Sequence, residues 1–251
     1  GFTEWTNVKK AVPLFDGHYQ PRVPLNGNYY CILDEGVMES QAELAKKYGI
    51  YGFCYYHYWF GHGKKLLEKP IERMLRNPNI AIPFCLSWDN NDWSKKYWDD
   101  GSPEIIAAQD YSDKDNLDRH IDYLCEFFAD KRYIKHDGKP LFIIYRPAII
   151  PGIKEKITCI RERVKQNGFP GIVIAVQHPS YMMYGRFIDF GADYYIQFEP
   201  LFSDFGRRKA ANIKDKIKYI ATLTLIHRKT QTDFFFASFT FLIFLKVLTL
   251  L

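Results

Sequence analysis

The chain has 251 residues, of which 25% are charged and 17% aromatic, and its formal net charge is +5. This length suits one large domain with a sizeable core. The positive charge does not indicate nucleic-acid binding, because it belongs to the last part of the chain. Residues 206–251 carry nine Lys or Arg against two Asp or Glu (+7), and residues 1–205 carry 25 against 27 (−2).

The five cysteines, at positions 31, 54, 85, 125 and 159, are widely spaced and form no C-x-x-C pair. Their odd number argues against a disulfide framework, and their spacing does not resemble a metal motif. We expect Cys54 and Cys85, which lie inside apolar runs, to be buried thiols in a reducing, cytoplasmic compartment. The N-terminal stretch GFTEWTNVKK does not have the composition of a signal peptide.

Short apolar runs alternate with amphipathic stretches along the chain. The stretches expected as helices are 37–49, 70–79, 116–133 and 153–168. The runs expected as strands are 50–60, 80–88, 140–147, 171–179 and 192–200. This alternation predicts an α/β fold with a parallel sheet and helical crossovers.

Each predicted strand ends in polar or aromatic residues, and no Gly-rich phosphate loop is present. In a (β/α)8 barrel the active site lies at the C-terminal ends of the strands, whereas a doubly wound sheet concentrates its ligand at one switch point. Five decorated strand ends in a row favour the TIM-barrel-like fold. Because only five strands are found by residue 200, we expect an incomplete barrel without its last strands. Unpaired sheet edges then predict poor soluble expression.

The stretch CLSWDNNDWSKKYWDDG, residues 85–101, places three tryptophans beside aspartates and asparagines directly after a predicted strand. Flat indole rings can stack on the apolar face of a sugar, and carboxylates and amides can bind its hydroxyls. The sequence therefore suggests a carbohydrate subsite. The alternative is that Trp88 and Trp93 cap the core, while the aspartates are solvated loop residues.

Three residues are candidates for catalysis. His57 could act as a general acid or base, or could simply be hydrogen-bonded in place. Glu199 could be catalytic, or could hold a neighbouring arginine such as Arg146. Asp92 and Glu199 end different strands and could flank a glycosidic bond. The candidate substrate-binding residues are Tyr56, Trp59, Trp88, Asn90, Asn91, Trp93, Tyr145, Arg146, Gln177 and His178. We expect no metal and no other cofactor, because no such motif is visible.

The last part of the chain changes character after residue 205. Residues 1–205 carry the partial barrel pattern, whereas 206–251 are first basic and then hydrophobic. Residues 234–251 are almost wholly apolar, which approaches the roughly 20 residues of a membrane helix. Three interpretations stay open for this segment: a membrane anchor, a buried core element, or sequence altered by a frameshift.

Several stretches together resemble the WbsX-type glycosyltransferase family, also described as glycoside hydrolase family 99-like. They are GFTEWTNVKKAVPLFDGHYQPRVPL, QAELAKKYGIYGFCYYHYWF, GKKLLEKP, PFCLSWDNNDWSKKYWDDG, DKRYIKHDGKPLFIIYRP and FEPLF. The resemblance covers about residues 1–205. It implies a (β/α)8 barrel that acts on glycosidic bonds in bacterial surface polysaccharide or O-antigen synthesis, with a glycan as its partner.

The chain departs from the family pattern in three places. Family members have a first strand ahead of GFTEW, so the resemblance implies that this strand is missing. The family stretch WANENWTRRWDG is altered, with Asp89 for Ala, Asn91 for Glu and Asp92 for Asn. A late N-E-W-x-E stretch, which by similarity supplies the catalytic glutamates, is absent. Whether this chain is an enzyme, or an inactive glycan-binding fragment, therefore stays open.

Overall fold

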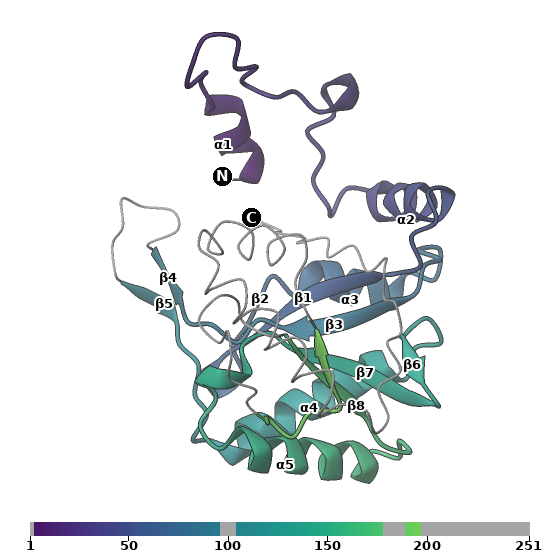
Figure 1. The fold of residues 1–251 in the computed structure, drawn as a ribbon. Helices are drawn as coiled ribbons and strands as arrows, with labels where there is room; N and C mark the ends of the chain where they lie inside the picture. Colours follow the sequence, from purple (N-terminus) through teal and green to yellow (C-terminus); the bar gives the residue numbers. More distant parts are fainter. Residues whose placement is uncertain (1–2, 96–103, 178–188, 197–251) are drawn as a thin grey trace, which may run out of the picture.

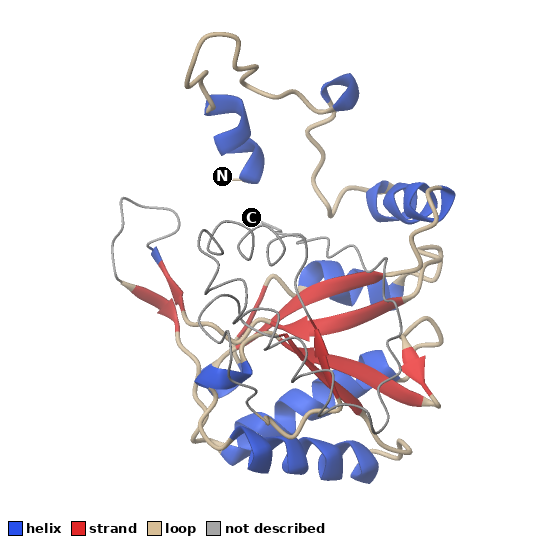
Figure 2. Cartoon of the chain, viewed as in Figure 1, coloured by secondary structure: helices blue, strands red, loops and turns tan. Residues whose placement is uncertain are grey.

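The computed structural model describes residues 3–95, 104–177 and 189–196. Within them, a mixed sheet has the strand order β2-β1-β3-β7-β8-β9, and β6 pairs with β7 at its side (Figures 1 and 2). The strands predicted from the apolar runs run parallel to one another. They are β1 (Phe53–Trp59), β3 (Phe84–Trp88), β7 (Lys139–Ile144), β8 (Val173–Gln177) and β9 (Tyr194–Ile196).

Two short strands that were not predicted run antiparallel to their neighbours. They are β2 (Lys65–Leu66), which pairs with β1, and β6 (Lys135–His136), which pairs with β7. The strand predicted over 80–88 begins only at Phe84. Pro83 has no backbone N–H for a sheet ladder, and its carbonyl instead accepts a hydrogen bond from the Phe53 N–H at 2.9 Å.

The helices agree with the amphipathic stretches. They are α2 (Val37–Lys47), α3 (Lys69–Arg76), α4 (Lys114–Phe128) and α5 (Ile153–Gln166). Asp113 caps the start of α4, where its side chain accepts a hydrogen bond from the Asn116 N–H at 3.0 Å. Helix α4 ends at Phe128, five residues before residue 133, where the predicted helix ended. Tyr133 instead forms a parallel bridge with Phe84, so the chain turns early to enter the sheet.

Helices α4 and α5 cover one face of the sheet, which we call the helix face (Figure 2). The register shows which side chains share it, because residues alternate between the two faces along a strand. One row across β1, β3, β7 and β8 is Tyr55, Leu86, Phe142 and Ile174, and the next is His57, Trp88, Ile144 and Val176. Phe142 contacts Phe128 and His120 of α4, which places both rows on the helix face.

The other side, which we call the opposite face, carries the alternate residues. The row in register is Tyr56, Ser87, Ile143 and Ala175. The row beyond it, two residues further along each strand, is Tyr58, Asp89, Tyr145 and Gln177. The Asp89 N–H donates to the His57 carbonyl and the Tyr145 N–H to the Trp88 carbonyl, both at 3.0 Å, so the ladder and its alternation continue past the strand ends.

The parallel strands follow one another in chain order across the sheet, and this order does not reverse within the described residues. A (β/α) barrel has this order, whereas a doubly wound sheet reverses it at the switch point. The described fold is thus an α/β fold built on an open, largely parallel sheet. An incomplete (β/α)8 barrel, without its first and last strands, stays a prediction.

The remaining elements lie around this core. The N-terminal part, with α1 (Glu4–Lys10) and the 3-10 turn η1 (Leu25–Gly27), extends away from the sheet (Figure 1). Strands β4 (Trp93–Ser94) and β5 (Ile105–Ala107) form a separate antiparallel pair. Two further 3-10 turns, η2 (Gly61–Gly63) and η4 (Pro147–Ile149), follow β1 and β7.

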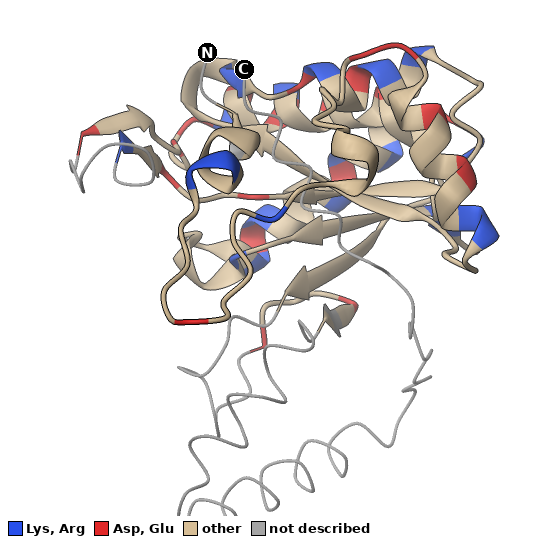
Figure 3. Ribbon diagram, turned by 90° about the horizontal axis from the view of Figure 1, so that it is seen from above, with Lys and Arg blue, Asp and Glu red and all other residues tan. Residues whose placement is uncertain are grey.

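Charged residues of both signs are interspersed along the helices, whereas the strands carry few (Figure 3). Cys54 and Cys85 are both fully buried, as the apolar runs predicted. None of the helices in the described ranges is long and apolar enough to cross a bilayer. The segment 234–251, for which a membrane anchor is one interpretation, lies outside those ranges.

Candidate functional site

Tyrosines gather on the opposite face, at the C-terminal ends of β1 and β7. The rings of Tyr56 and Tyr145 meet edge to face, with their centroids 5.5 Å apart. Burial, with a further contribution from Tyr145 and Asp89, raises the pKa of both Tyr56 and Tyr58 well above the usual range. These phenols therefore stay neutral and can donate hydrogen bonds beside a carboxylate.

Asn90 joins the loop after β3 to the loop after β7. Its amide nitrogen donates to the Arg146 carbonyl at 2.9 Å and to the Tyr111 hydroxyl at 3.1 Å. Its amide oxygen accepts from the Arg146 N–H at 2.8 Å. Since Asn90 is fully buried, these bonds satisfy both donor hydrogens in the interior. Asn90, which the sequence predicted to bind sugar, thus holds two loops together, and its side chain is not exposed to solvent.

Asn91 and Arg146 contact each other beyond the C-terminal ends of β3 and β7. The Arg146 guanidinium donates to the Asn91 side-chain oxygen at 2.8 Å, and the Asn91 amide nitrogen donates to Asp89. This chain of contacts presents an exposed cation beside a carboxylate. An arrangement of this kind can bind hydroxyl groups through the carboxylate and anionic groups through the guanidinium.

Asp92 is exposed and lies further along the same loop. One of its carboxylate oxygens accepts from the Gln109 N–H at 2.7 Å, which ties the loop to the segment before α4. Trp93 is half-buried on β4, where its ring packs edge-on against Tyr58, with centroids 4.8 Å apart. Trp93 therefore borders the tyrosine cluster, and its role in sugar binding stays a prediction.

The structure places His57 on the helix face, away from the tyrosines. Its Nε2 atom lies 2.7 Å from Nε2 of His120 on α4. Burial lowers the pKa of His57 to about 3, with a further contribution from Lys65. Burial first, and then His57, lowers the pKa of His120 as well. The two imidazoles are thus neutral at pH 7, and one donates to the other. Of the two interpretations, hydrogen bonding in place is the one this geometry favours.

Trp59 and Trp88 also lie on the helix face, and both are at least 94% buried. The Trp59 indole N–H donates to the Asn116 side-chain oxygen at 3.1 Å, and the Trp88 indole N–H donates to the Trp59 carbonyl at 3.1 Å. The His120 ring stacks on Trp59 at 4.9 Å. For these two residues, the role of capping the core explains the contacts better than sugar stacking does.

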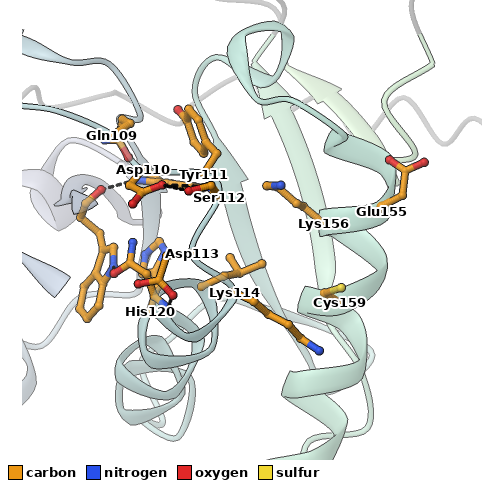
Figure 4. A pocket seen from close by; sticks show the side chains of 14 residues that line it. Gln109, Asp110, Tyr111, Ser112, Asp113, Lys114, His120, Glu155, Lys156 and Cys159 are labelled. Carbon is orange, nitrogen blue, oxygen red and sulfur yellow. Dashed lines mark hydrogen bonds between the residues drawn. The ribbon is translucent and has the colours of Figure 1, made fainter. Parts of the chain in front are cut away.

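A cavity of about 180 Å³ lies on the helix face, between the start of α4 and α5 (Figure 4). Trp59, Trp88 and His120 line it, together with Asp110, Lys114 and Lys156. It is smaller than the roughly 300–1,000 Å³ of common small-molecule sites. No three His, Cys, Asp or Glu side chains in the described ranges are grouped as a metal site would need.

Two predicted residues, His178 and Glu199, lie outside the described residues. Gln177, at the end of β8, is 5% exposed and lies on the opposite face, and its role in substrate binding stays a prediction. Sequence reasoning did not select Tyr58 or Asp89 for this face. The period of two along a strand is the signal that could have found them, because Tyr56 and Tyr58 must point to the same side.

Comparison with known proteins identifies the family. The profile described as "Glycosyltransferase WbsX" matches residues 1–242. The chain belongs to the glycosyltransferase WbsX family. This confirms the resemblance inferred from the motifs, and the match continues past residue 205.

Named relatives of this WbsX family member come from Xanthomonas campestris pv. campestris. In two strains, the protein described as "Uncharacterized protein WxcX" is 35% identical over 200 residues, which is 80% of this chain and 28% of the relative. The chain thus spans less than a third of the length of these relatives. A solved structure described as "Glycoside hydrolase-like protein" aligns with a TM-score of 0.47 at 15% identity, covering 67% of this chain and 51% of that one.

Proposed function

We propose that this WbsX family chain binds a glycan on the opposite face of its sheet, at the C-terminal ends of β1, β3, β7 and β8. The observation that carries the proposal is the convergence there of neutral tyrosines, the Asp89 carboxylate and the Arg146 guanidinium. Parallel α/β sheets place their ligands at this end of the strands. Family membership supports a sugar-containing substrate.

We further propose that the protein acts on glycosidic bonds in the synthesis of a bacterial surface polysaccharide, such as an O-antigen. In this proposal Glu199 and Asp92 are the catalytic carboxylates. His57 is assigned a structural part, because its Nε2 atom is already bonded to His120 in the interior. The alternative is a chain that binds glycans without turnover, which the absence of N-E-W-x-E from its sequence favours.

Binding is tested by titration calorimetry with the methyl glycosides of glucose, galactose, mannose and N-acetylglucosamine. Asp89→Asn should weaken the affinity about tenfold, because it removes a charged acceptor from the site. The matched control is Glu43→Gln, the same carboxylate-to-amide change at an exposed position on α2. If no glycoside binds the unaltered chain, the proposal is wrong.

Turnover is tested separately, with aryl glycosides and with sugar nucleotides. An enzyme should release the aryl alcohol or the nucleotide, and Glu199→Gln and Asp92→Asn should abolish that release while glycan affinity persists. A chain that binds the glycosides but never turns over either class of substrate would establish the alternative, a glycan-binding function.

A further inference from the structure

Two buried polar atoms on the opposite face have no hydrogen-bond partner among the residues that the structure describes. They are Oγ of Ser87 on β3 and Oε1 of Gln177 on β8. Ser87 is fully buried and Gln177 is 5% exposed. Buried polar atoms in native proteins are nearly always paired, so each exception calls for an explanation such as a bound ligand.

Both atoms belong to the part of the sheet that carries the proposed glycan site. Ser87 is in register with Tyr56 on one side and Ile143 on the other. Ile143 is in register with Ala175, and Gln177 lies two residues further along β8 on the same face. With strands ~4.8 Å apart and a rise of ~3.3 Å per residue, the two Cα atoms are roughly 12 Å apart. Ile143 lies between the two residues in the sheet, so a ring that bridges the two side-chain ends would lie over Ile143.

The chemistry of the two groups restricts which ligand can bind both of them. The Gln177 Oε1 atom can only accept a hydrogen bond, whereas the Ser87 hydroxyl can donate one and accept another. Neither group carries a charge. A hydroxyl-bearing neutral ring satisfies both, because each of its O–H groups donates and accepts. A phosphate group would offer Gln177 further acceptors and few donors.

We infer that Ser87 and Gln177 form the floor of the glycan site and bind two hydroxyls of one neutral sugar ring. This inference rests on the proposed function and adds to it a residue, Ser87, that the sequence motifs did not indicate. It also divides the roles in the site: Ser87 and Gln177 bind the uncharged ring, while Asp89 and Arg146 supply the charged groups at the strand ends.

The first experiment measures thermal unfolding and needs no ligand. Ser87→Ala should leave the melting temperature unchanged or raise it, because the lost hydroxyl has no hydrogen-bond partner among the described residues. The matched control is Tyr133→Phe, which removes a buried hydroxyl that donates to the Leu141 carbonyl at 2.8 Å and accepts from the Leu86 N–H at 3.1 Å. Tyr133→Phe should lower the melting temperature. If Ser87→Ala lowers it equally, the hydroxyl has a structural role and the inference is wrong.

The second experiment titrates Ser87→Ala and Gln177→Met with the methyl glycosides that bind the unaltered chain. Each variant should bind roughly three- to tenfold more weakly, the effect of one hydrogen bond. If Asp89→Asn weakens binding while both floor variants keep full affinity, the floor is overturned and the glycan proposal stands. If the unaltered chain binds none of the glycosides, the glycan proposal fails, and the floor fails with it.

Discussion

At the scale of single residues, the His57–His120 pair determines how the protein should respond to acid. The pKa of each imidazole is lowered in the folded state, chiefly by burial. In the unfolded chain, histidine takes up a proton near pH 6.5. Between pH 6.5 and about 3 the unfolded state therefore binds more protons than the folded state. The stability is present above pH 6.5 and is lost as the pH falls through this window.

We expect the free energy of unfolding to fall by about 1 kcal/mol per pH unit for each histidine between pH 6.5 and 4.5. Urea unfolding at several pH values measures this slope. The double change His57→Leu and His120→Leu should flatten it, because neither side chain can then be protonated. His62→Asn, a change at an exposed histidine, should keep the original slope. Equal slopes in the double variant and the unaltered chain would contradict the assignment.

Asn90 is the second residue with a predictable effect. Asn90→Ala leaves the backbone N–H and carbonyl of Arg146 without their partners, so we expect it to reduce the free energy of unfolding by about 2–3 kcal/mol. Asn91→Ala is the control, since it removes the same side chain from a half-buried position and should cost less than about 1 kcal/mol. Urea denaturation compares the two variants. Similar losses in the free energy of unfolding would refute the role of Asn90 in holding the two loops together.

At the scale of elements, Arg132, in the turn after α4, binds the end of α3 and the segment that leads from α3 into β3. Its guanidinium donates to the carbonyls of Asn77 and Met74, each at 2.7 Å, and of Ile80 at 3.0 Å. Asp130 holds the same guanidinium from the other side. The Met74 and Asn77 carbonyls lie at the end of α3, where the last carbonyls have no partner within the helix, so the arginine completes their hydrogen bonding.

Arg132→Lys should lower the free energy of unfolding by about 2 kcal/mol, because an ammonium group cannot match the planar fork of donors. Arg76→Lys, at the last residue of α3, is the control. Its side chain is 73% exposed and forms an i,i+4 pair with Glu72, so the change should cost less than about 0.5 kcal/mol. Chemical denaturation of both variants gives the comparison, and an equally small effect at Arg132 would show that the carbonyls find other partners.

At the scale of the whole molecule, the N-terminal part and the sheet differ in burial. Val12, Leu14, Phe15 and Leu25 are at least 67% exposed, whereas β1 and β3 are buried along their full length. Segments with few buried contacts open at low free energy. We expect backbone amides of residues 11–28 to exchange with deuterium at least a hundredfold faster than those of β1 and β3. Equal protection would mean that the N-terminal part is packed in solution.

The fold class was predictable because apolar runs and amphipathic stretches alternate along the chain. Long apolar runs such as 50–60 and 140–147 can be satisfied only in the interior, and the amphipathic stretches between them require one wet face. The positions of five parallel strands and four helices were therefore predicted correctly, apart from shifted ends. The four antiparallel strands β2, β4, β5 and β6 were missed, because strands of two or three residues carry no period.

The candidate site was less predictable, because the strand-end motifs mix the two faces of the sheet. His57 and Tyr56 are adjacent in the sequence, yet one packs against α4 and the other faces Tyr145. The alternation alone says that they point to opposite sides. Which of these sides carries the helices depends on how the crossovers pack, and local sequence does not encode that choice.

The sequence by itself determined the family, the alternation of strands and helices, and the burial of Cys54 and Cys85, since these follow from motif order and from local hydrophobicity. Only the tertiary structure decided that Trp59, Trp88 and His57 belong to the core under α4, and that Ser87 and Asp89 share a face with Tyr56 and Tyr58 of β1, with Tyr145 and with Gln177. The physical reason is that a side chain's role depends on the surface opposite it, which is contributed by residues distant in the chain.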